Sequence, residues 1–424
     1  MSRARDYRRD ASGRAVDPFL NRKRRFRPVL RLLGAEELFG ATPRGLQEAL
    51  WRGKRPEPRA VARDGVEAWA AAYVDRAFAE TDVAYGDGRV TFADLVAVII
   101  PLRGVLQFIG AQADVVPSVR RLIERALPGL DRICEEHSAG LYERVCGVAG
   151  RVAVACGDAQ SGVVWWRMDQ PQPDEVRKTG VEIVLGREAP EVVHVRADGL
   201  SRPAYRVGCL APTGERTGVT VARWVSVPAS VFGGNEDGEL PVYVQAHALR
   251  QMHERLDLPS MGPWSEFFLA QSLIEPKVAR ACGGGDVLVE FRFDVRKVGY
   301  LVLSRVGDRA LVRTFLLLTM AGTPEGDRLG RRLRLTRDEA RWLGLHRLSS
   351  LAASDVRDDA ELVAILAECG CGQLAEVARG VKFITVATGY AAELRKYIGL
   401  ASAEAETAAG DGDHGETAAL SAAA

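Results

Sequence analysis

The sequence has almost no net charge, few cysteines for its length and no long uninterrupted apolar run. Its 57 Lys and Arg residues stand against 56 Asp and Glu residues, which leaves a formal net charge of +1 over 424 residues. A chain so balanced has no overall field to attract nucleic acid or an anionic membrane, so any such attraction must be local. The seven cysteines are scattered and odd in number. A disulfide framework is dense and even, so we expect a reducing, cytoplasmic environment.

The most apolar stretch, residues 95–110, is interrupted by Pro101, Arg103 and Gln107. Its uninterrupted apolar run falls well short of the roughly 18 residues that span a bilayer. We therefore expect a buried helix with a kink at the proline, and no membrane association.

Several signatures of catalysis and metal binding are missing from the sequence. It contains no G-x-x-x-x-G-K-[ST], no G-x-G-x-x-G between a strand and a helix, and no G-x-S-x-G. Cys369 and Cys371 form a close pair, but they lack the second pair of ligands that a zinc site needs. The sequence therefore predicts no metal site and no cofactor.

The N-terminal segment carries the densest positive charge. Residues 1–27 contain ten Arg and Lys residues against three Asp residues. This arm is a candidate for binding the phosphate backbone of nucleic acid or an acidic protein partner, and a solvated terminus without fixed structure is the alternative. Because the segment is Arg-rich rather than apolar, we expect no secretory signal. The candidate nucleic-acid contacts are Arg22, Lys23, Arg24, Arg25 and Arg27.

Hydrophobic periodicity predicts an α+β protein of several domains. The expected parts are a basic arm and linker (1–60), a bundle of about four helices (61–150), a mainly β region (151–239), an α+β domain in which a helix packs on an antiparallel meander (240–345), C-terminal helices (346–400) and a disordered acidic tail (401–424). In the α+β domain, helices are expected over 244–256 and 264–273, and strands over 286–293, 299–306 and 310–319. Thr336 and Glu339 have the spacing of a capping box, and a further helix is expected over 359–369.

The predicted helix at 244–256 carries the candidate site. At 100 degrees per residue, His247, Arg250, Gln251 and Glu254 share a polar stripe, with Arg255 at its edge. A histidine exchanges protons near neutral pH, and arginine presents donor pairs that fit a phosphate. These groups permit cleavage of RNA without a metal, in which a base deprotonates the ribose 2′-hydroxyl and arginine stabilises the charge that develops on the phosphate.

This segment also resembles a known family. The resemblance, over about residues 241–320, rests on His247-Ala-Leu-Arg250, Glu254-Arg255 and, in the last strand of the meander, Arg313-Thr314-Phe315. It is to the helix-then-sheet core of the RelE and BrnT superfamily of bacterial toxins, small proteins of ribonuclease fold that cut or bind mRNA. The resemblance implies basic positions on the helix at His247, Arg250 and Arg255, with Arg313 facing them from a strand.

Simpler interpretations remain open. An ordinary surface helix also shows His, Arg, Gln and Glu on its wet side. His253 falls among the apolar positions and is expected to be a half-buried imidazole with a hydrogen-bond partner, and His346 is expected to cap a helix C-terminus. A second basic run, either a solvated loop or an RNA contact, comprises Arg328, Arg331, Arg332, Arg334 and Arg337.

The sequence therefore predicts a cytoplasmic protein, bacterial by its Ala- and Arg-rich composition, that binds RNA or a ribonucleoprotein. Metal-independent ribonuclease activity at His247 is part of this hypothesis. The rival hypothesis is a non-enzymatic interaction or assembly protein, in which the toxin-like fold is a scaffold and the basic arm holds a partner. The two hypotheses require different geometries, because an active site needs His247 and Arg250 to face Arg313 across an open cleft.

Overall fold

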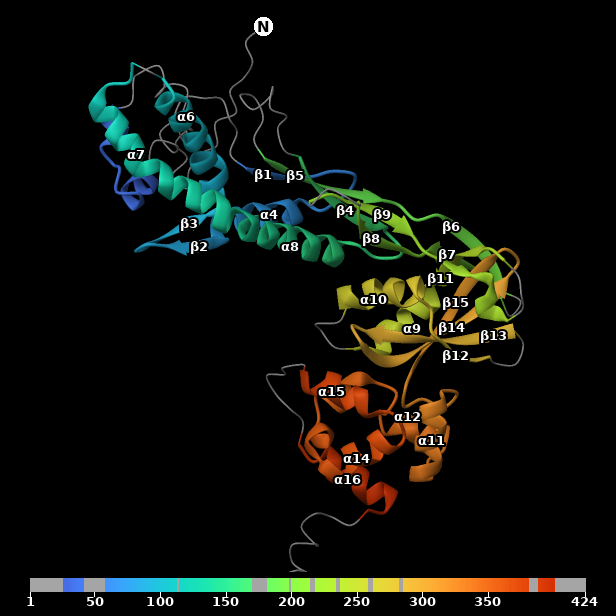
Figure 1. Cartoon of the computed structure of the whole chain (residues 1–424). Coiled ribbons are helices and arrows are strands. Elements are labelled where there is room, and N and C mark those ends of the chain that lie inside the picture. The colour runs from blue at the N-terminus through green and yellow to red at the C-terminus, as the bar shows by residue number, and fades with distance from the viewer. Residues whose placement is uncertain are drawn as a thin grey trace, which may run out of the picture. The chain divides into compact units, whose positions relative to one another are not determined.

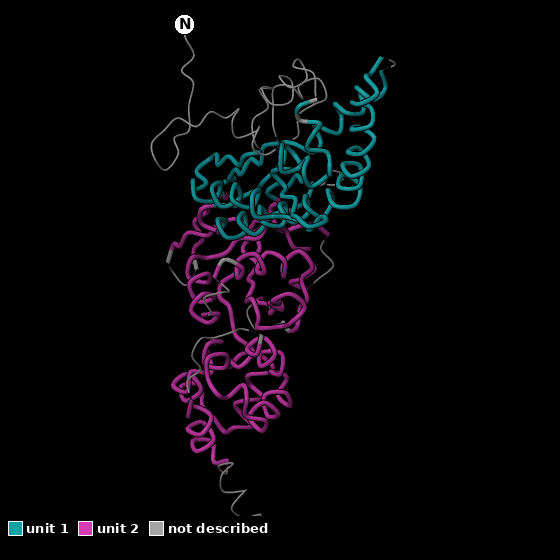
Figure 2. The backbone as a smooth tube through the Cα atoms, turned by 90° about the vertical axis from the view of Figure 1, so that its left-hand side faces the viewer, with its two compact units in different colours: residues 1–157, 162–189, 210–222 teal, residues 158–161, 190–209, 223–424 magenta. Residues whose placement is uncertain are grey.

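Figure 1 shows the computed structural model of the chain, a mixed α+β fold. The structure describes residues 26–41, 58–112, 114–169, 181–197, 200–213, 218–233, 237–257, 262–281, 285–380 and 388–400. The chain forms two units, coloured in Figure 2. Unit 1 comprises residues 1–157, 162–189 and 210–222, and unit 2 comprises residues 158–161, 190–209 and 223–424.

Unit 1 is a helical assembly joined to a small sheet. Its helices are α2 (Leu38–Ala41), α4 (Ala68–Glu80), a continuous helix formed by α5 (Phe92–Asp94), η1 (Leu95–Ile99) and α6 (Ile100–Gly110), then α7 (Pro117–Arg132), η2 (Ile133–His137) and α8 (Ser138–Cys156). The three-stranded sheet has the order β1 (Arg59–Ala62), β5 (Glu182–Glu188), β4 (Val163–Asp169). The core between helices and sheet includes Phe92, Leu95, Leu130, Val145 and Ile183.

The predicted bundle thus has its helices, and it also contains a hairpin. Strands β2 (Asp82–Tyr85) and β3 (Gly88–Thr91) pair antiparallel within the segment predicted to be helical. Gly86 has a φ of 55°, a left-handed conformation that favours glycine in a two-residue hairpin connection. Thr91 and Asp94 form a capping box at the start of α5, with both reciprocal hydrogen bonds present.

The apolar stretch at 95–110 belongs to the continuous helix Phe92–Gly110. Leu95–Ile99 is a π-helical turn that directly precedes Pro101, so the helix departs from α-helical hydrogen bonding next to the residue that cannot donate. Within the described part of the chain, Phe92–Gly110 is the one helix long and apolar enough to cross a membrane by length and composition, and 44% of its apolar window is buried in the protein. The prediction of no membrane association remains a prediction.

Unit 2 is built on an eight-stranded sheet. Its main path has the order β12 (Val278–Ala281), β13 (Asp286–Phe293), β14 (Arg296–Val306), β15 (Arg309–Leu317), β11 (Glu239–Gln245), β7 (Leu200–Arg206), β6 (Val192–Ala197), and β10 (Ser226–Pro228) pairs with β11. The meander β12–β15 is antiparallel, whereas β15 and β11 pair in parallel. The strands predicted for 151–239 are therefore divided, because β4 and β5 belong to the unit 1 sheet while β6, β7 and β10 belong to the sheet of the meander.

Two β runs within the segment 151–239 are interrupted. The run 205–210 divides at Val207 into β7 and β8 (Gly208–Pro212), and the run 219–227 divides at Val225 into β9 (Thr220–Trp224) and β10. At the break the Val207 N–H donates to Val242, the Val225 N–H to Val207 and the Val242 N–H to Val225. These bonds satisfy the backbone N–H groups at the points where the chain leaves regular strand pairing.

Helices complete unit 2. They are α9 (Ala246–Arg255), α10 (Gly262–Ile274), α11 (Pro324–Leu333), α12 (Arg337–Trp342), α13 (Leu348–Ala352), α14 (Ala360–Glu368), α15 (Gly372–Gly380) and α16 (Tyr390–Ile398), with 3₁₀ turns η3 (Ala229–Phe232) and η5 (Asp355–Asp358). The predicted strand 286–293, the capping box of Thr336 with Glu339 and the helix that begins after Asp359 are confirmed. Val244 lies in β11, so α9 begins two residues later than predicted.

Candidate functional site

Helix α9 is anchored by its apolar face and presents its polar face. Ala248, Leu249 and Met252 are buried, and the helix begins directly after β11. His247 is partly buried, while Arg250 is exposed. The helix is amphipathic, as expected. Ala248 is buried, whereas Ala246, which directly follows β11, is only partly buried.

Both ring nitrogens of His247 are engaged. Nδ1 lies 2.9 Å from Arg250 Nη2, and Nε2 lies 2.7 Å from the side-chain amide of Gln251. Arginine can only donate, so Nδ1 accepts from Arg250. Burial lowers the pKa of His247, and the charges of Arg250, Arg202 and Arg255 lower it further. The imidazole is therefore neutral and held from both sides.

A short polar chain continues from His247 to Arg255. The Thr314 hydroxyl on β15 bonds the Gln251 amide, and Arg255 Nη1 lies 3.5 Å from the same hydroxyl. The neighbouring Arg313 forms an ion pair with Asp286 on β13, with 3.4 Å between Nη1 and Oδ2. The strand residue that bonds the polar stripe is thus Thr314, and sequence reasoning had not assigned it a role.

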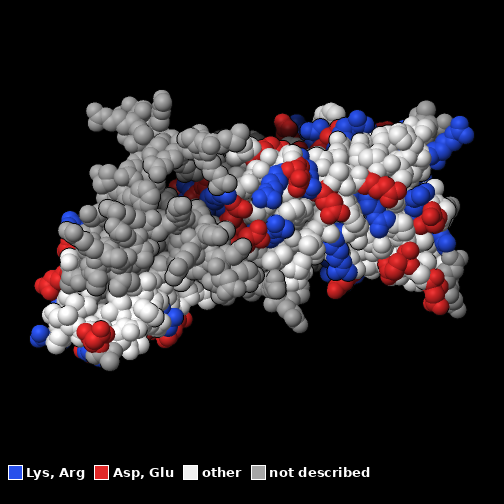
Figure 3. Space-filling view, turned by 90° about the horizontal axis from the view of Figure 1, so that it is seen from above, with Lys and Arg blue, Asp and Glu red and all other residues white. Residues whose placement is uncertain are grey.

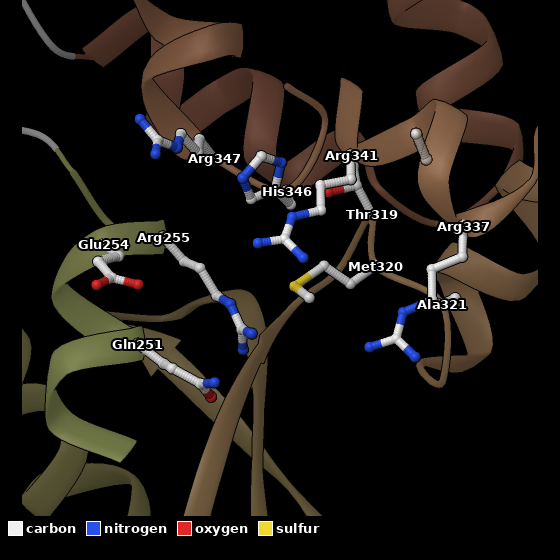
Figure 4. A pocket seen from close by; sticks show the side chains of 11 residues that line it. Gln251, Glu254, Arg255, Thr319, Met320, Ala321, Arg337, Arg341, His346 and Arg347 are labelled. Carbon is white, nitrogen blue, oxygen red and sulfur yellow. The ribbon is translucent and has the colours of Figure 1, made fainter. Parts of the chain in front are cut away.

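A pocket of about 250 Å³ opens beside this chain (Figure 4). We call it the arginine pocket; its lining residues are Gln251, Glu254, Arg255, Thr319, Met320, Ala321, Arg337, Ala340, Arg341, His346 and Arg347. In Figure 4, Arg255 reaches from α9 toward the space that Arg341 enters from the opposite side. The volume is below the roughly 300–1,000 Å³ of a pocket for a drug-sized ligand, so it suits a compact group.

The pocket concentrates like charge. Four guanidinium groups line it against one carboxylate, that of Glu254. Burial lowers the pKa of Arg255; Glu254 opposes that shift, and the charges of Arg337 and Arg341 add to it. Among the residues that the structure describes, no carboxylate pairs with the guanidinium of Arg337, Arg341 or Arg347. Glu254 offsets part of this repulsion, and a bound anion would relieve the rest.

His346 is a pocket residue whose role the sequence analysis misjudged. Its Nδ1 is buried and has no hydrogen-bond partner in the described chain, so the expected capping interaction is not formed by this atom. Burial lowers the pKa of His346, and Arg347, Arg341 and Arg255 lower it further while Asp257 opposes them. A buried ring nitrogen without a partner next to three arginines is a place for a ligand atom.

The other predicted residues lie elsewhere. His253 has the expected partner: it bonds Glu266, with 3.2 Å between Nε2 and Oε1, and its side chain is 43% exposed and so about half-buried. The second basic run is divided. Arg337 lines the pocket, whereas Arg328 lies on α11 and donates to the Cys369 carbonyl, and Arg332 pairs with Glu368.

The basic arm is barely represented. Arg22, Lys23, Arg24 and Arg25 lie outside the described residues, and Arg27 is exposed in a helical segment. Over the face shown in Figure 3, basic and acidic side chains are interspersed.

The described residues contain no group of three or more His, Cys, Asp or Glu side chains arranged to hold a metal ion. Arg341, His346 and Arg347 were not among the candidate site residues, because no short motif contains them. The only sequence signal was the clustering of arginine after residue 328.

Comparisons with family models, with curated proteins and with solved structures found no match to this chain.

Proposed function

We propose that this protein binds RNA and that the arginine pocket holds a phosphate of the RNA backbone. The observation that carries the proposal is that Arg255, Arg337 and Arg341 converge on one small space. Glu254 is the one carboxylate among the residues that line it. Guanidinium groups bind phosphate through paired donors, and a cluster of like charges gains from a bound anion.

The polar stripe extends the basic surface beyond the pocket. Arg250 and Arg202 act on His247 electrostatically, as does Arg255 inside the pocket. A backbone that entered the pocket would thus meet further positive charge along α9. Several phosphate contacts in a row give binding that weakens steeply with salt, which is the behaviour of a polyanion site.

Fluorescence anisotropy with a labelled single-stranded RNA, measured over a salt series, tests the proposal. Arg341→Gln is expected to weaken binding about tenfold, as for the loss of a charge-assisted hydrogen bond. It is also expected to reduce the slope of log K against log salt by about 0.7. Arg151→Gln is the matched control, because Arg151 is exposed on α8 and does not line the pocket. Equal effects of the two variants would contradict the proposal, and a DNA strand of the same sequence shows whether the 2′-hydroxyl contributes.

Metal-independent cleavage at His247 is a second candidate. The lowered pKa favours it, because a general base must be unprotonated. The engagement of Nδ1 by Arg250 and of Nε2 by Gln251 opposes it, since one of these contacts must open before the ring can take a proton. The resemblance to RelE and BrnT toxins supports cleavage only as a resemblance, so binding is the function that the geometry favours.

Incubation with mixed RNA in EDTA, alongside His247→Ala, separates the two candidates. Cleavage by the unmodified protein that is lost in His247→Ala would establish a ribonuclease. Intact RNA in both tubes, together with salt-dependent binding, would establish a binding protein. Intact RNA without binding would leave the interaction or assembly protein as the remaining hypothesis.

A further inference from the structure

Two large aromatic side chains lie exposed together on unit 2. Trp342, at the end of α12, is 76% exposed, and Tyr397 on α16 is 44% exposed. Their ring centroids are 5.6 Å apart with an interplanar angle of 39°. We call them the aromatic pair. Exposed aromatic rings that contact each other form an apolar surface, which is a feature of binding sites.

A hydrogen bond to α12 fixes the position of Tyr397 in the aromatic pair. The Tyr397 hydroxyl donates to Glu339 Oε1 at 2.9 Å, and Glu339 is fixed by its capping box with Thr336. Tyr397 is thereby tied to the helix that carries Trp342. A surface ordered in this way loses little side-chain entropy when a flat ligand stacks on it.

Helix α12 joins the aromatic pair to the arginine pocket. Arg337 and Arg341 line the pocket, and Trp342 follows Arg341 directly in the chain. Arg341 enters the pocket in Figure 4, whereas Trp342 is exposed to solvent. One short helix thus presents groups for a phosphate and, next to them, a surface for a base.

We propose that an unpaired base of the RNA stacks on Trp342 while a neighbouring phosphate occupies the arginine pocket. This inference rests on the proposed function and narrows its ligand to single-stranded RNA. Every base has a π-face, so stacking of this kind is tolerant of sequence, and it requires that the base is not already stacked in a duplex. Charge complementarity at the adjoining pocket is the reason to prefer a nucleotide over a protein segment as the occupant.

The test compares exposed tryptophans. Trp342→Ala is expected to weaken binding of a labelled single-stranded RNA about 5- to 100-fold, the range for removal of one stacking aromatic. Trp342→Phe should keep most of the affinity. Trp69→Ala is the matched control, because Trp69 is 53% exposed on α4 and far from α12 in the sequence. Trp342→Ala should not weaken binding of a duplex of the same sequence, since paired bases are not available.

A separate readout keeps the two proposals distinguishable. Inorganic phosphate should raise the melting temperature of Trp342→Ala as much as that of the unmodified protein, because the pocket is intact. If Arg341→Gln weakens RNA binding and Trp342→Ala does not, stacking is overturned, the proposed function stands, and a protein contact becomes the reason for the exposed pair. If Trp342→Ala also abolishes the phosphate effect or weakens duplex binding equally, stacking is overturned as well. If single-stranded RNA does not bind at all, both proposals fail.

Discussion

Arg250 Nη2 lies 2.9 Å from Nδ1 of His247, one turn earlier on α9. This contact defines the state of the imidazole, because the guanidinium can only donate and its charge disfavours a protonated ring. The basic side chains therefore make His247 a neutral hydrogen-bonding residue near pH 7 rather than an added positive charge. A phosphate nearby would reverse that influence.

We expect His247 to titrate below the usual histidine value of about 6.5. Arg250→Ala should raise the pKa, because it removes the largest of the charges that oppose protonation, while the effect of burial remains. NMR titration of histidine-labelled protein measures both values. Arg250→Lys, which keeps the charge, serves as the control. A ring that titrates at or above about 6.5 in the unmodified protein would contradict the described contact.

His253 should behave in the opposite way. Its bond to Glu266 raises its pKa; burial opposes the shift, and Glu266 and Asp158 support it electrostatically. A group whose pKa is higher in the folded state stabilises fully below the unfolded value of about 6.5, and this contribution is lost as the pH rises through the folded value. His253→Gln should therefore cost at most about 1 kcal/mol near pH 5.5 and less near pH 8.5. Urea unfolding at both pH values is the measurement, and an equal or larger cost at the higher pH would show the sign to be wrong.

A buried ion pair links β14 to α11. Lys297 Nζ lies 2.9 Å from Glu325 Oε1, and the Tyr300 hydroxyl lies 3.1 Å from Oε2 of the same carboxylate. Glu325 is 5% exposed, so Glu325→Gln should lower the free energy of unfolding by about 1–3 kcal/mol, because it leaves the Lys297 charge with only the more distant carboxylate of Glu290, 3.7 Å away. Glu376→Gln is the matched control. It breaks an exposed pair with Arg296 and should cost less than about 1 kcal/mol. Denaturant unfolding compares them, and similar costs would mean that burial does not set the value of the Lys297 pair.

Two glycines of α11 should differ sharply. A Cβ on Gly326 would overlap the carbonyl oxygen of Met320, a residue that lines the arginine pocket. Gly326→Ala must displace backbone and should cost about 1–3 kcal/mol or more, and it should also weaken phosphate binding. At Gly330 the nearest atom to a new Cβ is the Leu335 oxygen at 3.4 Å, so Gly330→Ala should be neutral or stabilise by up to about 1 kcal/mol. Thermal unfolding with and without phosphate measures both effects, and a harmless Gly326→Ala would refute the close approach.

Much of the fold could be predicted because its signals are local. The strand β13 has the predicted bounds, and the capping box of Thr336 with Glu339 is formed as its spacing indicates. The signals failed where a distant partner decides. Val244 has a place in the apolar pattern of α9, yet it pairs with Tyr205 and Val312 as part of β11. An apolar residue at the junction of a strand and a helix fits the apolar pattern of either element. Pairing with the neighbouring strands decides that Val244 belongs to the strand.

The sequence by itself determined the α+β character, the amphipathic helix at His247 and the ends of elements with capping residues, because each depends on side chains within a few positions of one another. Only the tertiary structure decided that Arg255 shares a pocket with Arg341 and His346, and that Thr314 rather than Arg313 bonds the polar stripe. No local sequence pattern indicates that residues more than eighty positions apart lie close together in the fold. Their meeting depends on how the sheet brings α9, the end of β15 and α12 together, which no local pattern encodes.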